Sequence, residues 1–553
     1  AISTLNNRKG FLHMKKKLLP ALIVTGLIIL VVIIMGITAL INKYTPTKKT
    51  EDLKEYFNTS SDDEAALIVD NELSDYKAKI IDKKIYVDYK FVHDSLNSRF
   101  YWDANENVLL YTTASDIISA AADSNSYSVT KQTNDFGYPI VKATSDSALI
   151  ALDYVKQYSN ITFKSYDDPA RIVITSKWNE IDSATVSKST QVRVRGGIKS
   201  PILKEVKKDD KITILDSGDK WDKVATEDGI IGYIKRKALS ESKKTKLTNP
   251  DYEEETFTHI KKDKDICLAW NQVTSQSANS KVPQVISSTK GINVMSPTWF
   301  YLNDNNGNLA DIASKDYVNY CHSQGIEVWG LFSNLENTDV DAAYVLTHTS
   351  TRTTLINQIM SAAFNYELDG VNIDFENITE AAYGDSYIEF IRELAIKCHN
   401  NGISLSVDVT VPASFNKFFN RSDMANFADY IVIMGYDEHY KGSDAGSVSS
   451  IPWVTEGVES TLKEVPADQI ILGMPFYTRI WELTPKEDDD AVTDTEDQSK
   501  YTVASQVYSM DAAAAQLATN NATAALDEES GQNYAEWSAS NKLYKVWLED
   551  NTS

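Results

Sequence analysis

The chain has 553 residues, of which 24% are charged and 42% are hydrophobic, and its formal net charge is −23. Its length predicts about three or four domains and excludes a single hydrophobic core, while its composition is that of folded protein. The acidic balance argues against nucleic acid as a partner, because phosphates select a basic surface. Three scattered cysteines without C-x-x-C spacing support neither a disulfide framework nor a zinc site.

The strongest local signal is an uncharged apolar stretch over residues 18–41, long enough to cross a bilayer as a helix. Five Lys or Arg residues precede it and three follow closely, so the positive-inside rule predicts a cytoplasmic tail at residues 1–17 and an extracellular remainder. A cleaved signal peptide is the alternative, but its apolar region is shorter, about 7–15 residues, and no A-x-A cleavage site follows here. We therefore expect a single-pass protein of the cell membrane, held in the lipid bilayer by this helix.

After a polar spacer at residues 42–56, the chain contains an internal repeat. Residues 84–111 align without gaps to residues 147–174, with apolar residues at matching positions. Each copy predicts a strand, a helix and two strands around an acidic turn. The repeat resembles the copper amine oxidase N-terminal-like modules of bacterial surface proteins, which implies a stalk or binding domain over residues 57–178. It holds one histidine, His93, so a metal site is not expected.

Residues 184–241 show short alternating runs separated by Gly and Asp-Gly turns, as expected for a small β-barrel. The runs lie at residues 191–195, 211–215, 221–225 and 230–235. The pattern VRVR followed by WDKVATEDGIIGYI resembles the bacterial Src-homology-3-like domain, a module that often contacts cell wall. A spacer without a ligand is an equally good interpretation. Residues 242–256 are predicted to link this domain to the next.

From residue 257 to residue 553, β-rich segments alternate with helical patterns. Parallel β/α units of this kind predict a (β/α)8 TIM barrel, whose chemistry takes place at the carboxyl ends of the strands. Seven strands are expected, at residues 266–270, 291–295, 327–331, 370–375, 403–409, 430–434 and 469–474. The residues that end these strands are therefore the candidates for a functional site.

The fourth strand ends in DGVNIDFE, residues 369–376. Strand alternation places Asn372, Asp374 and Glu376 on the face toward the barrel axis and the apolar residues between them on the opposite face. Two carboxyl groups two residues apart repel each other, which raises the pKa of one enough to keep its proton near neutral pH. A general acid requires such a proton. The structural alternative is that these acids are surface charges or helix caps, because a single D-x-E pattern often occurs by chance.

The full string is more specific, because DGVNIDFE resembles the DGxDxDxE signature of glycoside hydrolase family 18, the chitinase-like enzymes. Two further segments agree with that family. MGYD, residues 434–437, matches its sixth strand, and GMPFYTRIW, residues 473–481, resembles its seventh. The resemblance extends over most of the chain after residue 257. It implies a glycosidase that cleaves N-acetylated sugar polymers and needs no cofactor or metal.

The family works by substrate assistance, in which the N-acetyl oxygen of the sugar attacks the anomeric carbon and no protein nucleophile is needed. The resemblance makes Glu376 the proton donor and later the base that activates water. It makes Asp374 the residue that orients and stabilises the acetamide, and Tyr436 a hydrogen-bond donor to the acetamide oxygen. Weaker candidates for substrate binding, the two tryptophans being equally good candidates for the core, are Asn372, Asp369, Met434, Asp437, Tyr477, Arg479, Trp270 and Trp299.

The sequence departs from the signature at Asn372, where the family has an aspartate that shares a proton with Asp374. The Asn372 amide can still hydrogen-bond Asp374, so we expect an altered pH dependence rather than lost chemistry. A Src-homology-3-like module together with an Asn-containing signature resembles the spore and cell-wall branch of the family. We therefore expect peptidoglycan-type N-acetylglucosaminyl bonds as the substrate in preference to crystalline chitin.

With seven strands counted, the chain is expected to be truncated before the eighth strand of the barrel, which leaves two strand edges exposed. The eighth strand of the family brings a tryptophan that floors the sugar subsite. Retention of Glu376 favours an enzyme, since lectin-like family members commonly lose that residue. A non-catalytic carbohydrate-binding or cell-wall adhesion protein is the alternative. A metalloenzyme is not supported, because His439 beside Asp437 and Glu438 lacks ligand spacing.

Overall fold

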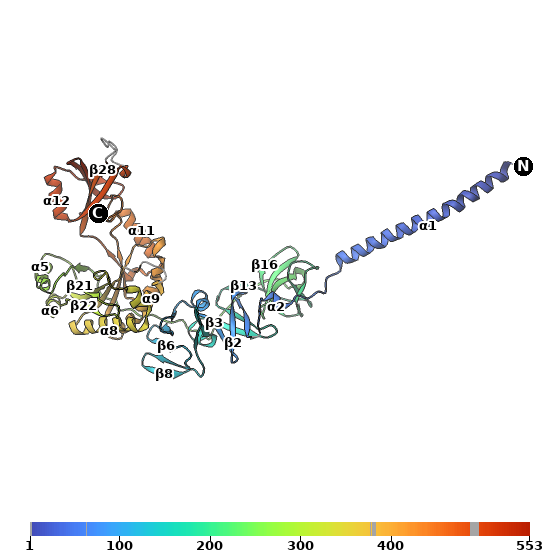
Figure 1. Ribbon diagram of the computed structural model, residues 1–553, viewed down its shortest axis with the longest axis horizontal. Helices are drawn as coiled ribbons and strands as arrows, with labels where there is room; N and C mark the ends of the chain where they lie inside the picture. Colours follow the sequence, from blue (N-terminus) through green and yellow to red (C-terminus); the bar gives the residue numbers. More distant parts are fainter. Residues whose placement is uncertain (1–2, 62, 377, 379–382, 487–496) are drawn as a thin grey trace. The chain divides into compact units, whose positions relative to one another are not determined.

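The computed structural model describes residues 3–61, 63–376, 378, 383–486 and 497–553 (Figure 1). The chain divides into two compact units. The first consists of Ala1–Val92 and Leu149–Glu253, and the second of His93–Ala148 and Glu254–Ser553. The middle of the repeat region at residues 57–178 belongs to the second unit. The finer domain boundaries expected from the sequence stay predictions.

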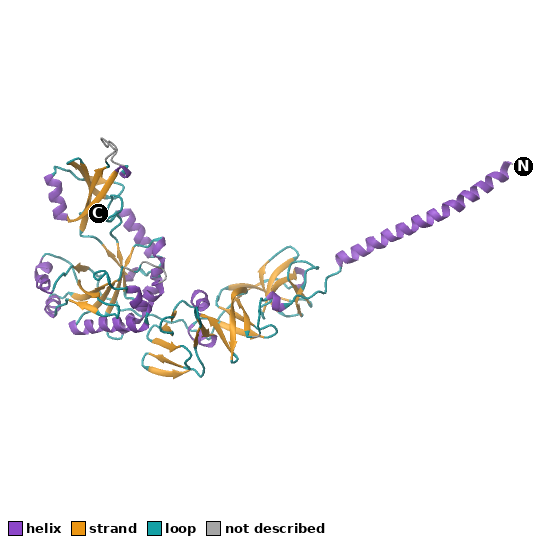
Figure 2. Cartoon of the chain, viewed as in Figure 1, coloured by secondary structure: helices purple, strands orange, loops and turns teal. Residues whose placement is uncertain are grey.

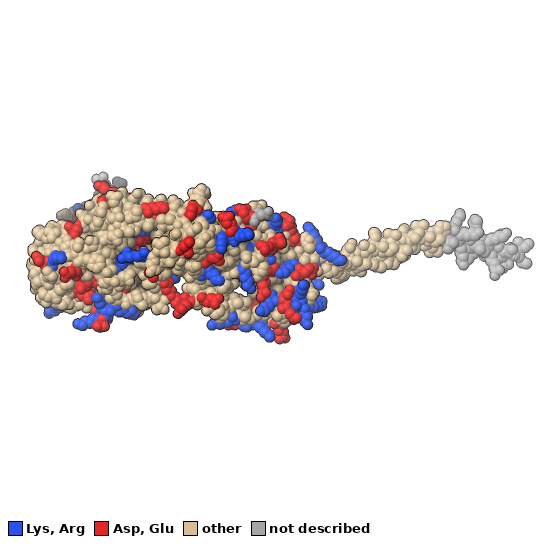
Figure 3. All heavy atoms as spheres, turned by 90° about the horizontal axis from the view of Figure 1, so that it is seen from below, with Lys and Arg blue, Asp and Glu red and all other residues tan. Residues whose placement is uncertain are grey.

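Helix α1, Ser3–Tyr44, contains the apolar stretch expected to cross a membrane. Its part from Pro20 to Tyr44 has a mean hydropathy of 2.9 and is not buried against other described residues. Length and composition suit a membrane span, and an N-terminal signal sequence has the same properties. Figure 3 shows this stretch free of charged side chains along most of its length.

The first unit contains a mixed sheet built largely from the repeat region. Its strands include, in spatial order, β11-β12-β1-β2-β3-β10. Their bounds are Glu64–Val69 (β1), Glu72–Ile81 (β2), Lys84–Asp88 (β3), Ala148–Ala151 (β10), Thr162–Tyr166 (β11) and Arg171–Thr175 (β12). The accompanying helices are α2 (Leu53–Tyr56), α3 (Tyr89–Phe91) and α4 (Leu152–Tyr158). β12 runs parallel to β1, and β3 runs antiparallel to β10.

Each repeat copy folds in the predicted order of a strand, a helix and two strands. The first copy is β3-α3-β4-β5 and the second is β10-α4-β11-β12. The two hairpins are used differently. The second hairpin stays in the mixed sheet of the first unit, whereas the first hairpin, β4 (Phe100–Asp103) and β5 (Val108–Thr112), belongs to the second unit.

A second, antiparallel sheet completes the first unit. Its strands follow the order β15-β14-β18-β17-β16-β13-β19. Their bounds are Glu180–Thr185 (β13), Thr190–Arg193 (β14), Ile202–Val206 (β15), Lys211–Asp216 (β16), Trp221–Thr226 (β17), Ile231–Lys235 (β18) and Lys243–Lys246 (β19). Alternate apolar side chains such as Val192, Ile212 and Val224 form its core, as strand periodicity requires. The four strands expected between residues 191 and 235 are confirmed.

In the second unit, the first repeat hairpin opens a small antiparallel sheet of order β4-β5-β6-β7-β8. Its further strands are β6 (Ile117–Ala121), β7 (Ser126–Val129) and β8 (Gln132–Asp135), and β9 (Val141–Ala143) follows them. All four residues of β4 are buried. They are covered because the hairpin packs against helix α9, Gly384–His399, where the Tyr101 hydroxyl lies 2.9 Å from the Ser386 hydroxyl.

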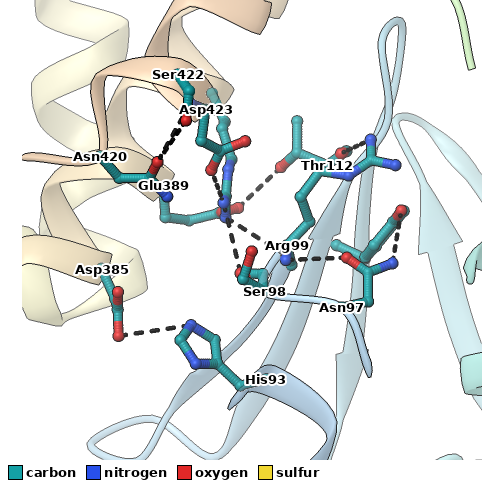
Figure 4. A network of polar contacts seen from close by, with 12 residues as sticks. His93, Asn97, Ser98, Arg99, Thr112, Asp385, Glu389, Asn420, Ser422 and Asp423 are labelled. Carbon is teal, nitrogen blue, oxygen red and sulfur yellow. Dashed lines mark hydrogen bonds and ion pairs between the residues drawn. The ribbon is translucent and has the colours of Figure 1, made fainter. Parts of the chain in front are cut away.

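Polar side chains join this small sheet to α9, and Figure 4 shows part of the network. Arg392 donates to Glu389 at 3.0 Å, to Asp423, and to two main-chain oxygens just before β4. Thr112, at the end of β5, donates to Glu389 at 2.8 Å. We call the buried residues Arg392, Glu389 and Asp423 the arginine cluster.

The larger part of the second unit is a half-barrel sheet of parallel strands in the order β20-β21-β23-β24-β25-β26-β27, flanked by helices (Figure 2). The strands are β20 (Leu268–Asn271), β21 (Val294–Leu302), β23 (Glu327–Ser333), β24 (Gly370–Asp374), β25 (Ser404–Thr410), β26 (Tyr430–Met434) and β27 (Ile470–Gly473). All seven expected strands are therefore confirmed. In the part of the chain that the structure describes, β20 and β27 are the two edges of this sheet.

Helices connect the parallel strands and cover their outer face. They are α5 (Val282–Ser287), α6 (Lys315–Ser323), α7 (Ala342–Thr347), α8 (Thr349–Tyr366), α9, α10 (Arg421–Phe427) and α11 (Ile451–Thr461), while the short strand β22 (Leu309–Asp311) pairs with β21. The expected apolar face of α9, which includes Ile388, Ile391 and Leu394, packs into the main hydrophobic core. Its opposite face is also buried, because the small sheet covers it.

After β27 the chain leaves the parallel sheet. An antiparallel sheet of order β29-β28-β32-β31-β30 follows. Its elements are β28 (Tyr477–Pro485), β29 (Tyr501–Ser509), α12 (Met510–Thr519), β30 (Ala525–Asp527), β31 (Gln532–Ala539) and β32 (Lys542–Leu548). The seventh parallel strand, expected at residues 469–474, is β27, which ends at Gly473. The remainder of the segment 473–481 runs into β28, which begins at Tyr477 and belongs to the antiparallel sheet.

Candidate active site

The site is built on β24, whose side chains alternate as the sequence predicts. Val371, Ile373 and Phe375 point outward into the main hydrophobic core. Asn372 and Asp374 point to the inner face of the sheet, and Glu376 is exposed just beyond the carboxyl end of the strand. A strand that is apolar on one face and acidic on the other thus carries its acids to the open end of the half-barrel.

Glu376 and Asp374 lie in a strongly acidic environment. Burial raises the pKa of Glu376, and the nearby carboxylates of Asp437 and Glu336 raise it further. Burial also raises the pKa of Asp374, to about 7, with contributions from Glu376 and Glu336. One carboxyl oxygen of Asp374, Oδ1, is buried and has no hydrogen-bond partner among the residues that the structure describes. The main-chain N–H of Glu376 donates to Asn334 Oδ1 at 3.0 Å, which fixes the backbone that carries the exposed acid.

Asn372 is fully buried and uses all of its hydrogen-bonding capacity. Its Oδ1 accepts from the indole N–H of Trp270 at 2.9 Å and from the Ser296 hydroxyl at 3.1 Å. Its Nδ2 donates to Ser406 Oγ at 3.0 Å and to Asp408 Oδ1 at 2.7 Å. The expected hydrogen bond from Asn372 to Asp374 is therefore wrong, because both amide hydrogens are directed to β25 instead.

Asp408 is a site residue that sequence reasoning missed. It is 3% exposed and lies on β25, the strand next to β24. The signal was available in the segment SLSVDVT, in which Ser404, Ser406 and Asp408 alternate with Leu405, Val407 and Val409. An acid on the inner face of a strand next to the signature strand should have been a candidate. Burial raises the pKa of Asp408 well above its usual range, and the charge of Asp374 raises it further.

Glu336 was also missed. It follows β23, and its carboxylate accepts a hydrogen bond from the Ser333 hydroxyl. Its charge raises the pKa of both Asp374 and Glu376. We call Asp374, Glu376, Asp408 and Glu336 the carboxyl cluster. None of the four forms an ion pair with Lys, Arg or His in the described part of the chain.

Two residues of β26 and its following loop reach this cluster. Met434 is buried at the last position of β26. Tyr436 follows it and packs edge-on against Trp270, with ring centroids 6.1 Å apart. Burial raises the pKa of the Tyr436 hydroxyl, and the charges of Asp408 and Asp374 raise it further. This hydroxyl therefore remains a hydrogen-bond donor beside the carboxyl cluster.

Three predicted residues meet at the edge of the site. Asp437, which follows Tyr436, adopts a left-handed backbone conformation with φ of 59°. Its Oδ1 accepts a hydrogen bond from the Tyr477 hydroxyl at 2.8 Å and lies 3.4 Å from Arg479 Nη2. Tyr477 and Arg479 belong to β28, so they approach the site from the antiparallel sheet and not from a parallel strand.

Two predicted binding residues lie elsewhere. Asp369 precedes β24, at the end of the strand opposite to Glu376, and its Oδ2 binds His322 and the main-chain N–H of Val328, each at 2.8 Å. Trp299 is 0% exposed and donates to Asn279 at 2.8 Å in the core between sheet and helices. Neither residue can contact a substrate at the carboxyl ends of the strands, and both are removed from the candidate site.

The site suits proton transfer more than metal binding. Within the described residues, no group of three or more His, Cys, Asp and Glu side chains is placed to hold a metal ion. One exposed acid, Glu376, stands beside buried acids that disfavour further negative charge. The raised pKa of Glu376 favours its protonated form, from which a proton can be delivered to a leaving oxygen.

Comparison with known proteins agrees with this geometry. Residues 332–553 match the family model described as Glycosyl hydrolases family 18. The uncharacterized glycosylase YvbX of Bacillus subtilis (strain 168) is 25% identical over 194 residues, which cover 32% of this chain and 55% of YvbX. The putative sporulation-specific glycosylase YdhD of the same organism is 32% identical over 141 residues, 25% of this chain and 33% of YdhD.

A third relative is the cortical fragment-lytic enzyme of Bacillus subtilis (strain 168). It is 24% identical over 255 residues, which cover 44% of this chain and 56% of that enzyme. The chain thus spans about a third to a half of the length of these relatives. The matched residues include the ends of β23 to β27 and therefore Asn372, Asp374 and Glu376. The chain carries a glycoside hydrolase family 18 domain.

Proposed function

We propose that this protein is a membrane-anchored, extracellular glycoside hydrolase that cleaves β-linked N-acetylglucosamine-containing polymers. The observation that carries the proposal is the position of Glu376. It is exposed at the carboxyl end of β24, and burial and two nearby acids raise its pKa. An acid that keeps its proton and still reaches solvent is what the leaving oxygen of a glycoside requires.

The proposed reaction is substrate-assisted and retaining. The acetamide oxygen of the sugar attacks the anomeric carbon while the bond to the leaving oxygen breaks, and Glu376 gives its proton to that oxygen. Asp374 stabilises the resulting oxazolinium ion, and the Tyr436 hydroxyl hydrogen-bonds the acetamide oxygen. Glu376, now ionised, takes a proton from water as the water attacks the anomeric carbon and the bond from that carbon to the acetamide oxygen breaks, which restores the N-acetyl group. The unpartnered Asp374 Oδ1 supports this assignment, because it is a buried acceptor that lacks a donor.

The sugar subsite is proposed to include Trp270, Met434 and the Asp437, Tyr477 and Arg479 group. Trp270 and Tyr436 present adjoining rings on the inner face of the sheet. The hydrogen bonds of Asp437 hold the antiparallel sheet beside the site. This arrangement places aromatic and polar groups around one position, as carbohydrate sites require.

Peptidoglycan is proposed as the first substrate to test, with chitin-type chains as the second. One relative is named a cortical fragment-lytic enzyme, which supports a cell-wall polymer. The antiparallel sheet of β13 to β19 is proposed to be a Src-homology-3-like module that contacts cell wall. The mixed sheet is proposed to be a copper amine oxidase N-terminal-like stalk, and Pro20–Tyr44 to anchor the chain in the bilayer.

The decisive experiment measures reducing-sugar release by the full chain in detergent, from de-O-acetylated peptidoglycan and from chito-oligosaccharides. Glu376→Gln should lower the rate by about 100-fold or more, as expected for loss of a general acid. Glu456→Gln, an exposed residue of α11, is the matched control and should leave the rate unchanged. Equal rates for Glu376→Gln and the wild type would reject the proposed role of Glu376.

The same experiment tests the non-catalytic alternative. Binding of either polymer without release of reducing ends by the wild type would make the protein a carbohydrate-binding protein built on a hydrolase domain. Cleavage of one polymer and not of the other would identify the substrate class.

A further inference from the structure

The carboxyl cluster contains an acid for which the proposed reaction gives no role. Asp408 is buried beside the catalytic strand, and no cation neutralises it in the described part of the chain. A buried carboxylate without a cation or several hydrogen-bond donors is costly, so such a group normally holds a proton. Asp408 accepts a hydrogen bond from Asn372, and Trp270 is a second hydrogen-bond partner, but burial outweighs both in their effect on its pKa.

The strand register places Asp408 directly beside Asp374. Asn372 pairs with Ser406 and Ile373 with Val407 in the parallel ladder of β24 and β25. Asp374 and Asp408 are each two residues beyond the first pair and therefore take neighbouring positions on the inner face. Neighbouring strands lie about 4.8 Å apart, so these carboxyl groups face the same small space.

The orientation of the Asn372 amide is fixed by its partners. The indole N–H of Trp270 can only donate, so the atom it contacts must be the oxygen Oδ1 of Asn372. The other end of the amide, Nδ2, consequently faces Asp408. A carboxylate at position 372 would bring a second acid to within hydrogen-bond distance of Asp408. Asparagine at position 372 therefore suits aspartate at position 408, because its amide donates a hydrogen bond where a carboxylate would repel.

We propose that Asp408 is a positioning residue of this hydrolase: it supplies, from β25, the carboxyl group that Asn372 lacks, and it shares one proton with Asp374. The inference rests on the proposed function and deepens it. Asp408 contacts no reacting atom; it acts through Asp374, whose unpartnered Oδ1 is the acceptor available for the shared proton. The acid that the family signature carries on one strand is thereby moved to the adjacent strand.

The test compares pH profiles of kcat/KM for four forms of the full chain: wild type, Asp408→Asn, Asn372→Asp and the double variant Asn372→Asp/Asp408→Asn. Loss of the shared proton produces the alkaline limb of the profile. Repulsion between the carboxyl groups moves that limb to higher pH. Asp408→Asn should lower it by about one pH unit, Asn372→Asp should raise it by a similar amount, and the double variant should return it close to the wild-type position.

The parameters kcat and KM separate this role from a structural one. Asp408→Asn should lower kcat at neutral pH by about tenfold and leave KM within about twofold, because Asp374 acts mainly in the transition state. Ser404→Ala is the matched control. It lies on the same buried face of β25 and carries no titratable group, so its pH profile should coincide with that of the wild type.

A second readout does not depend on activity. A carboxyl group with a raised pKa keeps its proton in the folded state while the unfolded chain has lost it, so stability falls as pH rises through that window. The Tm of Asp408→Asn minus that of the wild type should therefore increase between pH 4 and pH 8, and the difference for Ser404→Ala should stay constant.

The outcomes separate the two proposals. An alkaline limb and a pH dependence of Tm that are both unchanged in Asp408→Asn would overturn the role of Asp408, even if Glu376→Gln is inactive. If the wild type cleaves neither polymer, the proposed function fails and the Tm comparison alone decides whether Asp408 holds a proton. If Asp408→Asn does not fold, the upward shift expected for Asn372→Asp decides instead.

Discussion

The second unit contains two acidic clusters, one buried and one with both buried and exposed members, that differ in the presence of a cation. In the arginine cluster, the guanidinium of Arg392 binds both Glu389 and Asp423. In the carboxyl cluster, the four acids have no ion pair with a basic residue in the described ranges. The first arrangement holds two elements together, whereas the second raises the pKa of Asp374, Glu376 and Asp408 and favours their protonated forms. The same residue types thus serve structure or chemistry according to whether their charge is neutralised.

The largest effect should come from removing the cation of the arginine cluster. Arg392→Met leaves Glu389 and Asp423 buried without a charge partner, which typically costs about 3–5 kcal/mol. The measurement is urea denaturation of the full chain, followed by tryptophan fluorescence and by activity. We expect the transition that abolishes activity to move to lower urea.

A triple variant provides the control for that change. Arg392→Met combined with Glu389→Gln and Asp423→Asn removes the acids' charges together with the cation, so most of the lost stability should return. Equal stability of the single and triple variants would show that the charges of the arginine cluster are not what holds the small sheet to α9.

In the carboxyl cluster, removing a charged group should raise the stability of the folded protein instead of lowering it. Burial and the charges of Glu376 and Glu336 raise the pKa of Asp374 to about 7 from its ordinary value of 3.8, so the folded state keeps a proton that the unfolded chain releases between these values. Stability is therefore lost as pH rises from about 4 to about 7, and Asp374→Asn removes that loss. We expect Asp374→Asn to stabilise the second unit by about 2 kcal/mol at pH 8, below the full value of about 1.4 kcal/mol per pKa unit because Asp374 is only half-buried.

The same variant should lose activity, because a neutral amide stabilises an oxazolinium ion less well than a carboxylate. Thermal unfolding at pH 4 and pH 8 and reducing-sugar release check the two effects together. A variant less stable than the wild type at pH 8 would contradict the comparison, since Asp374 would then be contributing to stability in its charged form.

The smallest expected change in unfolding free energy comes from a hydrogen bond at the border of the arginine cluster. Thr112→Val removes the hydrogen bond to Glu389 and leaves a buried carboxylate oxygen without this donor, which should cost about 1–2 kcal/mol. Thr175 occupies the matching position of the second repeat copy, at the end of β12 and only half-buried. Thr175→Val should change the unfolding free energy by less than about 0.5 kcal/mol. Equal effects in urea denaturation would show that Thr112 has no special role at α9.

Local patterns were sufficient to predict the parallel sheet and the central residues of the site. The alternation in residues 369–376 placed Asn372, Asp374 and Glu376 on one face, and each expected parallel strand is present. The same patterns could not show that one repeat hairpin would stay in the mixed sheet while the other would pack against α9. Both repeat copies share apolar positions, yet β4 is buried throughout while no residue of β11 is buried.

The two hairpins pack differently because of individual side chains that the shared apolar pattern of the repeat does not reveal. Tyr101, which contacts α9, corresponds to the exposed Lys164 in the second copy. Helix α9 carries Glu389, Arg392 and Glu393 on a face that a single amphipathic pattern predicts to be solvated. Those charges are buried because partners distant in sequence neutralise or hydrogen-bond them. Asp408 is a different case, because the alternation along β25 already indicated its place on the inner face, and only its pairing with Asp374 depends on the neighbouring strand.

The insertion of His93–Ala148 means that the chain crosses between the two units three times, after Val92, after Ala148 and after Glu253. A single cut after Glu253 would break the covalent link to residues 254–553, yet the contacts of β4 and β5 with α9 would still hold these residues on the other fragment. Release of the hydrolase domain from whatever holds the N-terminal helix would therefore require those contacts to break as well. The insertion should make the protein more resistant to shedding than a simple string of domains.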